Sequence, residues 1–236
     1  MLNRAVLIVG LGALALLPLG ALGTRFGFWD IGRGFQLLYT GVFVAAAVLV
    51  LGIAVLVFAL RAGRKNAVLP IGIGLLASIV ALATMGQQYR LTTTLPPIND
   101  ITTDFDDPPA FGALEQRGGR VLDYEPDKGV AQRRSYSHIE TERSDLAPVD
   151  ASRKALAVAR ELGWEVLADT DADGERTLEA TATTFWFGFV DDVVVRIRPE
   201  GNGSLVDVRS ASRVGSSDLG ANARRIDAFM ARFRGE

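Results

Sequence analysis

The stretch LPPINDITTDFDDPPAF, residues 95–111, divides the chain into two parts of different character. Long apolar runs with basic residues at their ends precede it. An acidic sequence with alternating apolar and polar residues follows it. We therefore expect this stretch, called the lead-in below, to connect a membrane anchor to a globular domain, with Ile101 and Phe111 as its buried apolar contacts.

Three runs without a charged residue, residues 5–22, 37–60 and 67–85, lie in the N-terminal part. A helix needs about 20 mostly apolar residues to cross a bilayer, so residues 1–90 are predicted to form a three-helix transmembrane anchor. The first run also resembles a signal peptide, because Arg4 precedes it and small residues end it. We expect an uncleaved span, and either interpretation leaves the C-terminal domain on the same side.

The distribution of basic residues predicts the orientation. The short connection between the second and third runs carries Arg61, Arg64 and Lys65 without an acid, and Arg4 lies on the same side. The opposite connection, residues 23–36, holds two arginines and one aspartate. Since short cytoplasmic loops are enriched in Lys and Arg, we expect the C-terminal domain to lie outside the cytoplasm.

Composition excludes several functional classes. The chain of 236 residues has no cysteine and one histidine, so disulfides and thiolate catalysis are excluded and a zinc site would depend on carboxylates. The acidic C-terminal part disfavours nucleic acid as a partner. The spans carry no Asp, Glu, Lys, Arg or His, which favours an anchor over a transporter. No cofactor is expected.

The C-terminal part predicts an α+β fold. Residues 91–147 are expected to form an extended Asp- and Pro-rich lead-in with loops, and residues 148–236 the folded domain. Helices are predicted at residues 151–162 and 219–233, capped by Asp150 and Asp218. Strand patterns occupy residues 164–168, 177–187, 189–198 and 205–212. The short connections predict a roughly four-stranded antiparallel sheet with both helices on one face.

The soluble part resembles a bacterial family known as domain of unknown function 1499. The resemblance begins with Asn-Asp-Ile-Thr-Thr-Asp at residues 99–104 and Asp-Pro-Pro-Ala-Phe at 107–111. It continues through Gly163-Trp164 and residues 188–192 and 195–199, and closes with 207–213, Gly215, Asp218, Gly220, Asn222 and Arg225. The resemblance implies a bacterial protein. Together with the predicted spans, it leads us to expect a multi-pass protein of the inner membrane, part of the cell envelope, with a periplasmic domain. It implies no activity.

Two regions contain candidate binding residues. Asp100 and Asp104 in the lead-in offer hard oxygen ligands for a divalent cation. Asp and Thr side chains in such a segment also accept hydrogen bonds from the backbone of their own turn, and we favour this second interpretation. The second region is the loop of residues 209–218, where Arg209 and Arg213 precede the start of the last helix. A helix N-terminus favours anions. The ligand-binding candidates there are Arg209, Arg213, Ser216, Ser217 and Asn222.

The arginines of this second region have an alternative role. Asp191, Asp192 and Asp207 lie in the neighbouring strands and are able to pair with them across the sheet. We favour this pairing. An anionic ligand and internal ion pairs therefore compete as explanations for the same basic side chains.

Three hypotheses about function follow. The first is a non-catalytic membrane-anchored protein whose extracytoplasmic domain binds a protein partner or a small anionic ligand. The second is a metal-dependent hydrolase that uses Asp100 and Asp104 with Asp191 or Asp192. The third is an accessory subunit of a larger membrane assembly that uses the uncharged spans as its interface. We expect the first, because no nucleophile elbow or histidine-based catalytic set is present.

Overall fold

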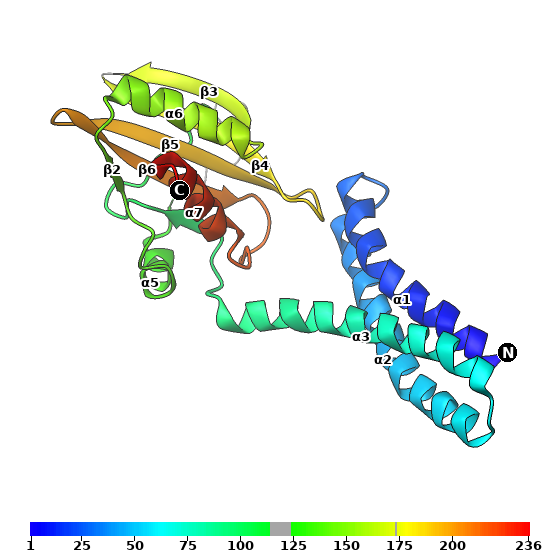
Figure 1. The fold of residues 1–236 in the computed structure, drawn as a ribbon. Coiled ribbons are helices and arrows are strands. Elements are labelled where there is room, and N and C mark those ends of the chain that lie inside the picture. Colours follow the sequence, from blue (N-terminus) through cyan, green and yellow to red (C-terminus); the bar gives the residue numbers. More distant parts are fainter. Residues whose placement is uncertain (114–123, 173) are drawn as a thin grey trace. The chain divides into compact units, whose positions relative to one another are not determined.

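The structure, a computed structural model, describes residues 1–113, 124–172 and 174–236 (Figure 1). Residues 114–123, which fall in the predicted loops, lie outside the described residues. The chain divides into two compact units. The first contains Met1–Leu91 and Phe185–Gly188, and the second contains Thr92–Thr184 and Phe189–Glu236.

The first unit contains three helices, α1 (Leu2–Arg25), α2 (Ile31–Arg61) and α3 (Lys65–Thr94). Each is long and apolar enough to cross a membrane, which confirms the three predicted apolar helices. Helices α1 and α3 pack closely where Gly10 meets Gly74, because a Cβ added to Gly10 would lie 2.4 Å from the Gly74 carbonyl oxygen. Small residues at helix crossings allow such backbone contact in membrane proteins.

The second unit contains a six-stranded antiparallel sheet in the order β1-β6-β5-β4-β3, with β2 also paired to β6. Its strands are β1 (Asp100–Thr102), β2 (Glu142–Ser144), β3 (Glu165–Ala172), β4 (Glu175–Thr183), β5 (Val190–Glu200) and β6 (Gly203–Ser212). The antiparallel α+β prediction is confirmed, but the expected number of strands is too small. The two additional strands have three residues each, too few for a period-two pattern, and they form through pairing with the distant β6.

Helices α6 (Pro148–Glu161) and α7 (Ala221–Arg234) lie against the same side of the sheet, as Figure 1 shows. Their apolar side chains form one core with the strands, in which Trp164 stacks on Phe229 at 5.4 Å between ring centroids. The predicted starts of both helices are wrong by two or three residues. Helix α6 begins at Pro148 because proline suits a first helical turn, and Asp150 lies inside that turn.

A short helix, α5 (Pro126–Ser135), occupies part of the region that was expected to form loops. It has no apolar stripe, and for that reason its sequence gives no periodic signal. Its buried Gln132 accepts a hydrogen bond from the Thr102 backbone N–H at 3.1 Å and donates one to the Thr102 carbonyl at 2.7 Å. The Gln132 amide therefore satisfies the free edge of β1, as a further strand would do.

The register of the sheet separates apolar from charged side chains. Ile101, Val193, Val195, Val206 and Val208 belong to the core under α6 and α7. Side chains of the intervening residues point to the opposite face, since successive residues of a strand alternate. We call this opposite face the lead-in face; it carries Asp100, Asp192, Arg196, Asp207 and Arg209.

Candidate functional site

The lead-in runs from the edge strand β1 across the lead-in face. After β1, the Thr103 N–H donates to the Val208 carbonyl of β6 at 3.0 Å. Further along, the Pro109 carbonyl accepts from Arg209 of β6 at 3.2 Å, and Phe111 packs against Val194 and Ala211. Ile101 is fully buried and Phe111 is 6% exposed, so the two expected apolar contacts are confirmed, one on each face.

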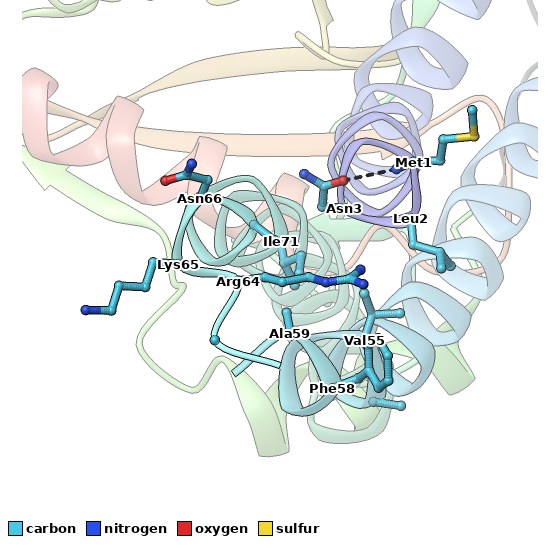
Figure 2. A pocket seen from close by; sticks show the side chains of 13 residues that line it. Met1, Leu2, Asn3, Val55, Phe58, Ala59, Arg64, Lys65, Asn66 and Ile71 are labelled. Carbon is cyan, nitrogen blue, oxygen red and sulfur yellow. Dashed lines mark hydrogen bonds between the residues drawn. The ribbon is translucent and has the colours of Figure 1, made fainter. Parts of the chain in front are cut away.

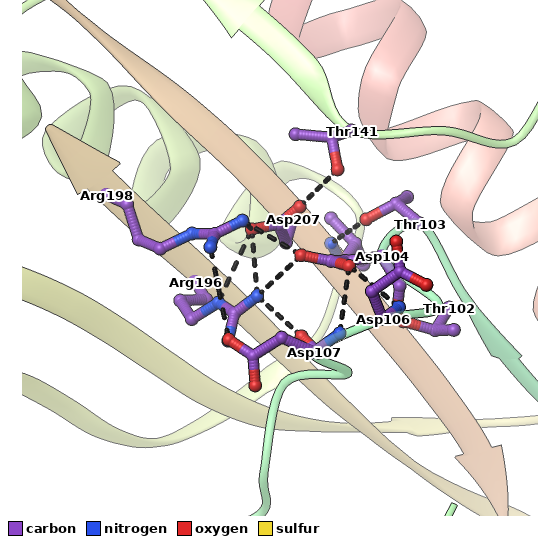
Figure 3. Close-up of polar contacts among 10 residues, drawn as sticks. Thr102, Thr103, Asp104, Asp106, Asp107, Thr141, Arg196, Arg198 and Asp207 are labelled. Carbon is purple, nitrogen blue, oxygen red and sulfur yellow. Dashed lines mark hydrogen bonds and ion pairs between the residues drawn. The ribbon is translucent and has the colours of Figure 1, made fainter. Parts of the chain in front are cut away.

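The centre of the lead-in face is a cluster of charged side chains around Arg196 of β5 (Figure 3). Arg196 donates to Asp107 at 2.7 Å, to Asp104 at 3.1 Å and to Asp207 at 3.2 Å. Arg198 also donates to Asp104 at 2.9 Å and to Asp207 at 2.8 Å. The Asp207 side chain is fully buried and the Arg196 side chain is 7% exposed, so the Coulombic attraction between these two is only weakly screened.

Asp104 organises the turn that brings the lead-in over this cluster. Its Oδ1 accepts from the backbone N–H groups of Asp106 and Asp107, both at 3.1 Å. Burial raises the pKa of this carboxyl, but those N–H groups and the charges of Arg196 and Arg198 outweigh burial and hold the pKa below its ordinary value of 3.8. Asp104 is therefore ionised at neutral pH and is compensated from within the chain.

Asp100, the other metal-site candidate, forms a bidentate ion pair with Arg209. The two distances are 3.0 Å and 2.8 Å, and the two side chains are 6% and 4% exposed. The Arg209 guanidinium also lies 4.9 Å from the ring centroid of Phe111. Among residues 1–113, 124–172 and 174–236, no group of three or more His, Cys, Asp or Glu side chains is placed to hold a metal ion. The structure brings Asp100 and Asp104 to one face, each engaged by arginine.

The other acidic candidates occupy different faces. Asp192 lies on the lead-in face, where it accepts from Arg213 at 2.8 Å to 3.1 Å. Asp191 lies on the helix-covered face and accepts from Arg225 of α7 at 2.5 Å. The predicted ion pairing across the sheet therefore occurs for Arg213, which pairs with Asp192, whereas Arg209 pairs with Asp100 of the lead-in. The hydrolase hypothesis offers these two aspartates as alternatives: Asp192 shares the lead-in face with Asp100 and Asp104 but is engaged by Arg213, whereas Asp191 lies on the opposite face.

The start of α7 is occupied by Asp218. Its carboxylate accepts from the N–H groups of Gly220 at 2.8 Å and Asn222 at 2.7 Å. The turn before the helix is left-handed at Leu219, φ 52°, and at Gly220, φ 77°. Burial raises the pKa of Asp218 above its ordinary value, against the effect of these two hydrogen bonds. The helix end therefore already holds an internal carboxylate.

The remaining candidates of this loop differ in accessibility. Ser216 is exposed, and the Ser217 hydroxyl accepts from the Leu219 N–H at 3.4 Å. Asn222 is fully buried: its Nδ2 donates to the Asn99 carbonyl and to Ser212 Oγ, both at 2.9 Å, and its Oδ1 accepts from Ser210 at 2.7 Å. Asn222 thus links α7 to β6 and to the beginning of β1.

Two adjoining pockets that sequence reasoning missed lie beside the lead-in, and both are lined by Phe105 and Arg133. Their volumes are about 520 Å³ and about 420 Å³. The Arg133 guanidinium lies 4.3 Å from the ring centroid of Phe105. The larger pocket also contains Tyr124 and Arg134, and the smaller one contains Arg143 and Arg198 together with the acidic residues Asp104, Asp106 and Glu140. The only signal in the sequence was the Arg133-Arg134 pair after a proline-initiated segment.

Comparisons with known proteins give a family and no activity. A family model described as "Protein of unknown function (DUF1499)" matches residues 100–233. No curated protein matches the chain. Among solved structures, the chain is similar to the vertebrate conserved region of human METTL16, with 12% identity, a TM-score of 0.29, and coverage of 58% of this chain and 98% of that one. These values carry no conclusion about function.

Proposed function

The chain belongs to the DUF1499 family, whose description assigns no activity, and we propose from its own residues that it is a non-catalytic, membrane-anchored binding protein. Its α+β unit binds a small ligand that carries a carboxylate or phosphate. The observation that carries this proposal is the pair of adjoining pockets that share Phe105 and Arg133.

The dimensions and lining of the pockets support a small ligand. Sites for small molecules usually have volumes of about 300–1,000 Å³ and combine apolar or aromatic walls with a few polar groups. Phe105 and Tyr124 provide aromatic surface, and Arg133 and Arg134 provide two exposed guanidiniums next to it. A ligand with a flat apolar part and an anionic group would use both features, since planar guanidiniums bind carboxylate and phosphate in a bidentate manner.

The internal ion pairs support a binding role over catalysis. Asp100, Asp104 and Asp207 each accept hydrogen bonds from buried or half-buried arginines, and the buried Asp192 accepts them from the exposed Arg213. An arginine that occupies these carboxylate oxygens hinders both catalysis and metal binding, because a substrate or a cation would first have to displace it. Arg133 is available, because its contact with Asp106 is 4.0 Å long and Asp106 is fully exposed.

The basic connection at residues 61–65 supports an extracytoplasmic position for the α+β unit in the inner membrane of a bacterium. A reporter that is active only in the cytoplasm, fused after Glu236, tests this position. We expect no activity from this fusion and activity from a fusion in the 61–65 connection. Activity after Glu236 would contradict the orientation.

The binding proposal is tested with the full-length protein in detergent. Its thermal unfolding is followed with aromatic carboxylates and organic phosphates at graded concentrations. A ligand at 100 times its Kd stabilises the folded state by about 2.7 kcal/mol, which corresponds to roughly 5–11 °C in Tm for a domain of this size. We expect such a shift for at least one compound.

Variants assign the site. The double substitution Arg133→Ala and Arg134→Ala is expected to abolish the ligand-induced shift. The matched control is Arg153→Ala on α6, which removes an exposed arginine that pairs with Asp150 and lines neither pocket. A shift that survives the double substitution, or that Arg153→Ala removes equally, would contradict the site. No shift with any compound would contradict the anionic ligand.

A further inference from the structure

A large cavity lies at one end of the helical unit, where the connection between α2 and α3 meets the start of α1 (Figure 2). Its volume is about 920 Å³. One part of its lining is apolar and includes Leu2, Val55, Phe58 and Ile71. Arg64 and Lys65 supply the basic part, and Figure 2 shows the Arg64 side chain extending toward Val55 and Phe58.

Several residues that line the cavity are small. They are Ala54, Ala59, Gly63 and Ala67. Ala59 and Ile71 are buried and belong to the apolar cluster between the helices. The cavity therefore borders the packed interior of the unit at Ala59 and Ile71, and most of its other lining residues are exposed.

The charge at this end has a single sign. Arg4, Arg61, Arg64 and Lys65 lie at or next to the connection and the start of α1, and all four are exposed. Asp30 is the only acidic residue of Met1–Leu91, and it caps α2 at the opposite end. The basic side chains at the cavity thus have no carboxylate of their own unit to pair with.

We propose that this cavity binds an anionic phospholipid. Its phosphate lies at Arg64 and Lys65, and one acyl chain follows the apolar wall formed by Leu2, Val55, Phe58 and Ile71. Within a bilayer such a cavity borders lipid, and an apolar wall favours a hydrocarbon chain. Basic pockets between transmembrane helices on the cytoplasmic side bind anionic headgroups, and the basic residues predict that side for this end.

The lipid site is separate from the pockets beside the lead-in, so neither proposal depends on the other.

The Arg64 Cζ lies 5.5 Å from the ring centroid of Phe58, which keeps the guanidinium above the apolar wall. This arrangement places the charge at the boundary between the headgroup region and the hydrocarbon. Both parts of a phospholipid therefore have a matching surface.

The test uses the full-length protein in a neutral detergent and native mass spectrometry. Phosphatidylglycerol is compared with phosphatidylcholine of identical acyl chains, and glycerol phosphate represents the headgroup without chains. We expect one phosphatidylglycerol bound in preference to phosphatidylcholine, and retention of little or no glycerol phosphate. Equal retention of the two lipids would overturn the charge selectivity. Binding of glycerol phosphate as strong as that of the lipid would overturn the role of the acyl chain.

Three variants assign the site. Arg64→Gln with Lys65→Gln is expected to weaken phosphatidylglycerol binding about 30-fold, from the typical contribution of two basic residues near an anionic membrane surface. Ala54→Phe keeps every charge and adds bulk to the lining of the cavity, so we expect it to lower binding as well. The control is Arg33→Gln at the opposite end, where only the backbone N–H of Arg33 bonds to Asp30.

The variants also separate lipid binding from folding. Each is first shown to keep the unfolding temperature of the lipid-free wild type. Unchanged phosphatidylglycerol binding in both the double variant and Ala54→Phe would overturn the proposal. An equal loss in Arg33→Gln would also overturn it, because the effect would then reflect the total charge and not this cavity.

Discussion

Replacing Asp100 by Asn tests whether the lead-in is a structural part of the sheet. The substitution keeps the shape of the side chain and removes the charge that faces Arg209, whose side chain is 4% exposed. Breaking a buried ion pair from one side costs about 3–5 kcal/mol. Arg209 keeps its hydrogen bond to the Pro109 carbonyl and its contact with the Phe111 ring, so we expect the lower end of that range.

For a domain of this size, about 3 kcal/mol corresponds to a decrease in Tm of roughly 6–12 °C. Thermal unfolding of the full-length protein in detergent is followed by the fluorescence of Trp164, which is buried against Phe229. Trp29→Phe and Trp186→Phe in the background leave this single reporter. The control Asp150→Asn breaks an exposed pair with Arg153 and is expected to cost less than about 1 kcal/mol.

The double variant Asp100→Leu and Arg209→Met removes both charges and is expected to recover much of the lost stability, because matched apolar residues often replace a buried ion pair without net cost. A decrease in Tm for Asp100→Asn no larger than that of the control would refute the structural role. Stabilisation of the wild type by divalent cations that Asp100→Asn abolishes would instead identify Asp100 as a metal ligand.

The remaining predictions concern pH and the loop before α7. The pKa of Asp104 is lower in the folded than in the unfolded state, so its contribution to stability is present above about pH 3.8 and is lost as the pH falls through the folded-state pKa. In Asp104→Asn, the free energy of unfolding should therefore depend less on pH in that window. The pKa of Asp218 is raised, so its contribution is present below about pH 3.8 and is lost as the pH rises through the folded-state pKa; Asp218→Asn, which keeps an acceptor oxygen, should remove this loss in the same titration. Asn222→Ala removes one buried hydrogen-bond partner from each of Ser210, Ser212 and Asn99 and should cost on the order of 3 kcal/mol in chemical denaturation; a cost below about 1 kcal/mol would contradict this role.

Much of the fold is predictable from local patterns. The apolar runs predict three helices, because crossing a bilayer demands length and hydrophobicity along one contiguous segment. The valine run in β5 and the alternation along β6 predict two strands, and the short connection between them predicts that they are antiparallel. Strand β1 was missed because its three residues acquire their structure only by pairing with β6, more than a hundred residues later.

The charged face was predictable in part. The pairing of Arg213 with Asp192 follows from the proximity of neighbouring strands. The pairing of Arg209 with Asp100 requires the position of β1, and the sequence alone does not give it. A usable signal was present in Val195-Arg196-Ile197-Arg198, where arginines alternate with apolar residues in a central strand. Such a strand predicts a basic face that needs acidic partners, and the lead-in supplies them.

The pockets beside the lead-in were beyond sequence reasoning for a different reason. Phe105 lies in the lead-in and Arg133 at the end of α5, a helix without an apolar stripe. Their contact depends on Gln132, which attaches α5 to the edge of β1 through the Thr102 backbone. The bond joins a side chain to the backbone of a strand that was itself not predicted, so no local pattern indicates it.

Amide hydrogen exchange tests most directly the central claim that the lead-in is an integral part of the folded sheet. The Thr102 and Thr103 amides donate to Gln132 and to the Val208 carbonyl. We predict that they exchange as slowly as the amides of β5, with the free energy of global unfolding. Exchange of the lead-in amides orders of magnitude faster than that of β5 would contradict the claim, because the segment would then open while the rest of the sheet stays folded.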